Sequence, residues 1–244
     1  MYIVCDLYEC CSLQHLVQML PVFVPLLFNI LEHDEDPAVQ QAAFYCLGLM
    51  VSKCKNAATP HLQRILRLCT DCISKHGANY RQSGLCIASE EALNGDDEAV
   101  AQQNRQRQFL GVIDNAMATV CKVLRDIDWA QGQQQPGRQQ LETVRNEAMT
   151  VWFKHLPLKS DTVEGRLCHE FVMKMVEKKH PIVIGQNLSN LPFVLKVFAA
   201  IRNTKMSTPS LDQVVAEFAQ TLCKSQPQFA QNLSPAERRN LGLQ

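Results

Sequence analysis

Apolar residues recur along this chain at the three- and four-residue spacing of a helix that is buried on one face. The spacing is clearest after Pro37, at Val39, Ala42, Ala43, Cys46, Leu47 and Met50. A preceding apolar stripe comprises Leu26, Leu27, Ile30 and Leu31, and a short acidic turn separates the two stripes. Since one helix pair cannot bury both stripes, the pattern predicts antiparallel helices that pack against further pairs of the same kind.

The same spacing predicts helices along most of the chain. We expect them over residues 12–33, 37–53, 59–77, 109–124, 139–155, 162–179, 191–201 and 211–223, with terminal helices at 2–11 and from 234. Ser12, Asp36 and Ser234 are expected N-caps, and Pro21 and Pro25 are expected to kink the first long helix. The order predicts an all-α fold, an α-solenoid of about four antiparallel helix pairs with a flanking helix at each end.

Two polar segments interrupt this rhythm. Residues 78–104 hold two glycines, five acidic residues and a Gln-rich run, which predicts an enlarged loop or a partly helical insertion. Residues 131–139 are Gln-rich and predict a flexible linker. With these exceptions, residues 1–244 are expected to form a single solenoid segment. The abrupt start of its first helix suggests a piece of a longer protein.

Composition supports a globular protein, with 46% hydrophobic and 20% charged residues. Residues 1–122 carry nine basic and thirteen acidic side chains, a net charge of −4, and residues 123–244 carry fifteen and eleven, a net charge of +4. This asymmetry argues against a uniformly nucleic-acid-binding surface, so no nucleic acid partner is expected. The apolar run Met19–Leu31 is too short to span a bilayer and holds two prolines, which favours a buried helix over a membrane segment.

The eleven cysteines favour a reducing compartment, because their number is odd and no positively charged secretory signal precedes them. Five of them lie among helical apolar residues, where a free cysteine behaves as a small hydrophobic residue: Cys46, Cys69, Cys121, Cys168 and Cys223. The glycosylation sequons at Asn187 and Asn232 are therefore expected to be unmodified.

Two short motifs suggest chemistry, and both have a simpler explanation. Cys69 and Cys72 have the spacing of a metal or redox pair, but no second such pair occurs, so a packed helix face is favoured. Cys168-His169-Glu170 has the residue types of a nucleophile, base and orienter, but consecutive helical residues point in different directions. We therefore expect no enzyme activity, cofactor or metal.

Acidic clusters are the candidate binding residues. One lies at the first turn and one in the 78–104 segment, and together they comprise Asp34, Glu35, Asp36, Glu90, Glu91, Asp96, Asp97 and Glu98. Since no Lys or Arg lies within either cluster, we expect a local negative potential that attracts basic partners. The alternative is that acidic residues favour the helix dipole at the turn and solubility in the loop.

Several segments carry a family likeness. Asp36-Pro-Ala-Val-Gln-Gln-Ala-Ala43 resembles the second helix of a HEAT repeat in the importin-β (karyopherin-β) superfamily. Leu156-Pro-Leu-Lys-Ser-Asp161, His180-Pro-Ile-Val-Ile-Gly185 and Asn187-Leu-Ser-Asn-Leu-Pro192 are similar to the carboxyl-terminal HEAT repeats of its karyopherin β3 branch. The segment Leu233-Ser-Pro-Ala-Glu237 resembles the last helix of that branch, and Asp114–Val123 resembles, less specifically, another of its helices.

The resemblance implies a nuclear import receptor that shuttles between cytoplasm and nucleus. Its partners would be protein cargo with basic import signals, the phenylalanine-glycine repeats of nucleoporins, and Ran-GTP, the last chiefly through amino-terminal repeats that this chain lacks. The 78–104 and 131–139 segments have no clear counterpart in the family. Two alternatives stay open: a HEAT-repeat scaffold for another assembly, such as a phosphatase, and a helical enzyme domain.

Overall fold

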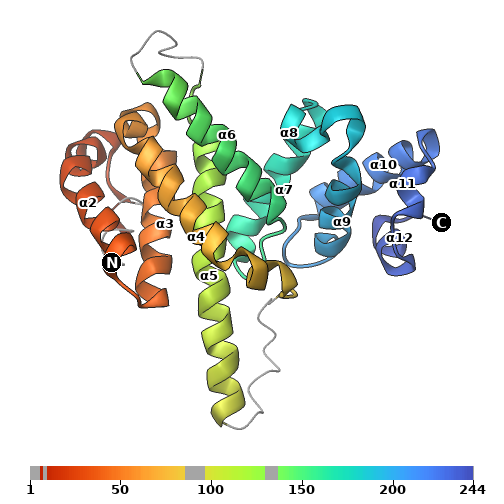
Figure 1. Ribbon diagram of the computed structural model, residues 1–244, viewed down its shortest axis with the longest axis horizontal. Helices are drawn as coiled ribbons and strands as arrows, with labels where there is room; N and C mark the ends of the chain where they lie inside the picture. The colour runs from red at the N-terminus through yellow and green to blue at the C-terminus, as the bar shows by residue number, and fades with distance from the viewer. Residues whose placement is uncertain (1–5, 8–9, 86–96, 130–136, 244) are drawn as a thin grey trace. The chain divides into compact units, whose positions relative to one another are not determined.

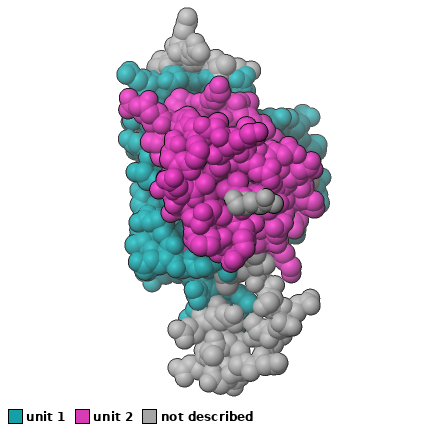
Figure 2. Space-filling model, turned by 90° about the vertical axis from the view of Figure 1, so that its right-hand side faces the viewer, with its two compact units in different colours: residues 1–155 teal, residues 156–244 magenta. Residues whose placement is uncertain are grey.

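The computed structural model describes residues 6–7, 10–85, 97–129 and 137–243, without the side chains of residues 97–103. Every regular element in these ranges is a helix, and they contain no strand (Figure 1). The predicted all-α class is therefore confirmed. The chain divides into two compact units, residues 1–155 and 156–244, which are coloured separately in Figure 2.

Unit 1 is built from long helices. Its elements are α2 (Leu13–His33), α3 (Pro37–Cys54), the 3-10 helix η1 (Lys55–His61), α4 (Leu62–Gln82), α5 (Asp97–Asp126) and α6 (Arg138–Lys154). Neighbouring helices pack together, as α2 does with α3 and α4 with α5. Alternate α-helices also pack together, α3 with α5 and α4 with α6 (Figure 1). The core of unit 1 includes the fully buried side chains of Tyr80 and Trp152.

The helix starts in unit 1 follow the predicted signals in part. Asp36 caps α3, because its Oδ1 accepts a hydrogen bond from the Ala38 N–H at 2.8 Å, and Pro37 takes the first helical position. Ser12 stands at the predicted N-cap of α2, yet its hydroxyl bonds to His15 Nδ1 at 2.9 Å rather than to a backbone N–H. The helix α2 continues through both of its prolines.

Two predicted boundaries in unit 1 are wrong. Gly77 does not end α4, which continues to Gln82; the glycine is buried, and a Cβ there would stand 2.2 Å from His155 Nε2. The predicted start of the same helix at residue 59 is also wrong. The 3-10 helix η1 occupies Lys55–His61, and α4 begins at Leu62.

The two polar segments lie partly outside the described residues. Helices α4 and α5 reach into the 78–104 segment from either side, up to Gln82 and from Asp97. Of the 131–139 segment, the described residues are 137–139, and α6 begins within them at Arg138.

Unit 2 has shorter helices with well-defined starts. Its elements are α7 (Thr162–Glu177), α8 (Pro181–Ile184), the 3-10 helix η3 (Gln186–Leu188), α9 (Leu191–Ile201), α10 (Pro209–Ser225), α11 (Gln228–Gln231) and α12 (Pro235–Leu241). Side chains of Asp161, Thr208 and Ser234 cap α7, α10 and α12. The capping box predicted for Ser234 and Glu237 is present, with both of its hydrogen bonds. The helix α12 packs on α9 and α10.

The predicted core cysteines are largely confirmed. Cys46, Cys69, Cys121 and Cys168 are buried, whereas Cys223 is half-buried. The helix α2 is longer than the apolar run seen in the sequence, and by length and composition it is the one helix among the described residues that meets the requirement for crossing a membrane. Its inner face packs on α3 and buries Leu16, Leu20 and Val24, but only 28% of its most apolar window is buried.

Candidate partner-binding surfaces

The acidic turn between α2 and α3 uses two of its three candidate carboxylates for its own structure. Asp34 Oδ1 accepts from the backbone N–H of Asp36 at 2.9 Å, and Asp36 Oδ1 caps α3. The Asp34 carbonyl accepts from Gln40 Nε2 at 2.6 Å, which ties the turn to the first turn of α3. Glu35 is exposed beside them. The turn therefore combines a structural role for Asp34 and Asp36 with one carboxylate directed at solvent.

A positively charged side chain from another helix lies beside this turn. The sequence does not indicate this contact. Arg64 on α4 makes a bidentate pair with Glu32, with Nη2 at 2.6 Å from Oε1 and 2.7 Å from Oε2. The same guanidinium lies 4.5 Å from the centre of the Phe28 ring. Glu32 and Arg64 are separated by 32 positions, so only the packing of α4 near the end of α2 brings them together. The pair reduces the negative potential of the turn on that side.

The second acidic cluster falls mostly outside the described residues. Glu90, Glu91 and Asp96 lie there, and Asp97 and Glu98 form the first turn of α5, where the backbone alone is described. Acidic residues in the first turn of a helix interact favourably with its dipole. The expected basic-partner site at this cluster stays a prediction.

Burial disfavours thiolate chemistry at Cys69 and Cys72. Burial raises the pKa of the Cys69 thiol well above its usual value and raises the pKa of Cys72 to about 12. A thiol must lose its proton to attack or to bind a metal, so both are poor nucleophiles and poor ligands in this fold. Among the described residues, no group of three His, Cys, Asp or Glu side chains is placed to hold a metal ion.

His169 is fully buried, and both of its ring nitrogens bond to the backbone. Nδ1 lies 2.9 Å from the Met206 carbonyl and must donate to it, so Nε2 accepts from the Leu158 N–H at 3.2 Å. Burial lowers the pKa of His169 to about 4. The ring is therefore neutral and fixed between two connecting segments, and it does not act on Cys168 or Glu170. Cys168 is also buried and Glu170 is half-buried, which agrees with the expectation that these three consecutive residues do not form a triad.

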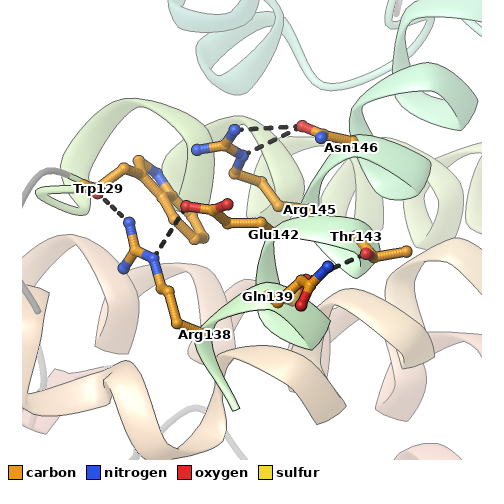
Figure 3. Close-up of polar contacts among 7 residues, drawn as sticks. All are labelled: Trp129, Arg138, Gln139, Glu142, Thr143, Arg145 and Asn146. Carbon is orange, nitrogen blue, oxygen red and sulfur yellow. Dashed lines mark hydrogen bonds and ion pairs between the residues drawn. The ribbon is translucent and has the colours of Figure 1, made fainter. Parts of the chain in front are cut away.

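A cluster of Trp129, Arg138, Glu142 and Arg145 joins the end of α5 to the start of α6 (Figure 3). The guanidinium carbons of Arg138 and Arg145 lie 5.6 and 4.8 Å from the indole centre of Trp129. Arg138 also donates to the Trp129 carbonyl and to Glu142 Oε1, the latter at 3.0 Å. The indole N–H donates to the Val123 carbonyl at 3.3 Å. Because these contacts are internal, the cluster ties Trp129 to the first turns of α6 rather than offering a free aromatic surface.

A polar seam runs along α5 where it faces α3. The Thr119 hydroxyl donates to the Phe44 carbonyl at 2.8 Å, and the Ser52 hydroxyl donates to Asp126 Oδ2 at 2.6 Å. Lys122 is 5% exposed, and its Nζ lies 5.4 Å from the centre of the Tyr45 ring. Hydrogen bonds from Arg125 and Ser52 outweigh burial and lower the pKa of the Asp126 carboxyl. The seam gives the α3–α5 interface specific polar contacts that the apolar pattern alone did not predict.

Two open grooves lie among the described residues of unit 2. One, of about 260 Å³, lies between α7 and α10, with Met173 and Leu211 on its floor and Glu170 and Lys174 at its edge. The other, of about 530 Å³, follows α10 and includes Arg202 and Asp212. Both are open and carry mixed charges, unlike the enclosed and mostly apolar pockets that bind small molecules.

No protein-family model matches the chain, and no solved structure matches it.

Proposed function

We propose that the chain is a protein-binding α-solenoid segment of the HEAT type, from the carboxyl-terminal end of an importin-β-type nuclear import receptor of the karyopherin β3 branch (importin five). It works without catalysis and without a cofactor. Its partners are cargo proteins with basic import signals and nucleoporin phenylalanine-glycine repeats, and Ran-GTP binds chiefly to repeats outside this chain. A receptor of this kind shuttles between cytoplasm and nucleus.

The helix packing within unit 1 is the observation that carries the proposal. In a stack of helix pairs, each helix contacts its partner in the pair and the corresponding helix of the next pair. The contacts of α2 with α3 and of α4 with α5 are of the first kind. The contacts of α3 with α5 and of α4 with α6 are of the second kind, whereas α2 makes no comparable contact with α4. This alternation supports a two-layer stack.

The connector after α7 supports the family likeness at the level of single residues. His180 stands at the N-cap of α8, and Asn190 Nδ2 donates to the Ile182 carbonyl at 2.7 Å. Gly185 has a φ of 73°, and a Cβ there would stand 2.4 Å from Ser189 Oγ. The residues that resemble the family therefore have defined tasks in this connector, and their identities are not those of an unconstrained loop.

A binding experiment separates the proposal from its alternatives. The full chain should bind immobilised phenylalanine-glycine repeats and should not bind the same repeats with phenylalanine replaced by serine. A scaffold of another assembly should bind neither. Equal binding to both peptides, or to neither, would refute the receptor proposal. Selective labelling of one cysteine by an activity-based probe would instead favour a helical enzyme.

The acidic cluster gives a prediction for cargo. Replacing Glu90, Glu91, Asp96, Asp97 and Glu98 by lysine should weaken binding of a basic import-signal peptide at least tenfold at low salt, because charge reversal turns attraction into repulsion. A matched control replaces five scattered exposed acidic residues, Asp71, Asp128, Glu147, Glu177 and Glu217, and so changes the net charge equally. Equal affinity of the two variants would contradict a localised patch. Fluorescence anisotropy with the labelled peptide is the measurement.

A further inference from the structure

We draw no further inference here: the strongest candidate, the open groove along α10 beside which Asp212 Oδ1 is buried without a hydrogen-bond partner among the described residues, is lined by charges of both signs, and nothing in the structure shows what occupies it.

Discussion

Each compact unit contains a buried histidine that joins distant segments, and the two histidines differ in what they bind. In unit 1, His155 Nδ1 donates to the Val151 carbonyl and Nε2 accepts from Arg81 Nη1, both at 2.7 Å. In unit 2, both nitrogens of His169 bond to backbone groups of Leu158 and Met206. The first ring links α4 to α6 through a charged side chain. The second links two connecting segments through their peptide groups.

The two histidines differ in whether water can replace the ring as a hydrogen-bond partner. Arg81 is exposed, so its guanidinium has water as an alternative partner when the His155 ring is removed. The Leu158 N–H and the Met206 carbonyl bond to a ring that is fully buried, so they have no comparable alternative. An unpaired buried backbone group costs far more than an exposed one. Unit 2 therefore depends more on its histidine than unit 1 does.

The largest effect is expected for His169→Ala. The substitution leaves a cavity and two unpaired backbone groups, and should lower the free energy of unfolding of unit 2 by about 4 kcal/mol. His155→Ala should cost about half as much. Far-UV circular dichroism in urea measures the loss, and tryptophan fluorescence follows unit 1 alone, because both tryptophans, Trp129 and Trp152, lie in it. A greater loss for His155→Ala would reverse the comparison.

The next effect is a pH dependence of unit 2. The pKa of His169 is about 4 in the folded protein, against an ordinary value of 6.5, so between these pH values only the unfolded chain binds the proton. The neutral His169 ring therefore contributes fully to the free energy of unfolding above pH 6.5. This contribution decreases as the pH falls toward 4, by up to about 3 kcal/mol. Urea unfolding of the natural chain and of His169→Gln at several pH values isolates this term as a difference. A pH-independent difference would contradict it.

A smaller effect is expected at the glycines beside the two rings. Gly77→Ala places a Cβ 2.2 Å from His155 Nε2 and should destabilise unit 1 by about 2 kcal/mol. At Gly165 the nearest atom is Met206 Cε at 2.7 Å, the movable end of a side chain, so Gly165→Ala should change stability by about 1 kcal/mol or less.

A double substitution identifies the cause of the loss at Gly77. In His155→Ala the ring is absent, so Gly77→Ala should then be neutral or stabilising, since alanine favours the helix. Gly84→Ala is the matched control, because no atom lies within 4 Å of a Cβ there. Additive losses in the double variant would show that the ring is not the obstacle. Tryptophan fluorescence in urea is the measurement.

Features that depend on neighbours in the chain were predictable. The acidic or hydroxyl caps with a following proline at Asp36 and Ser234 are local signals, and both act as expected. The apolar stripes also depend on local periodicity and indicate the long helices and most of the buried cysteines, but not the short helices α8 and α11 or the first part of α5. Such signals predict where a helix starts, because the capping side chain and the backbone N–H that donates to it are only two or three residues apart.

Features that depend on distant residues were not predictable. The sequence predicts a helix end at Gly77, whereas Gly77 lies inside α4. A glycine is required there because the His155 ring, 78 positions later, occupies the space that a side chain would fill. The pairing of Glu32 with Arg64 has the same origin. The polar residues of α5 also interrupted its apolar pattern without indicating their partners on α3. In each case the role of the residue depends on a contact with a residue far away in the sequence.

The polar seam between α3 and α5 fixes the register of the two helices. Two smooth apolar helices can slide past each other by one turn, about 5.4 Å, with little change in buried area. Here such a slip would separate the Thr119 hydroxyl from the Phe44 carbonyl and Ser52 from Asp126 together. A helix pair joined by such a seam should resist axial slippage while its helices can still tilt. Tilting, rather than sliding, is then the relative movement that we expect of α3 and α5.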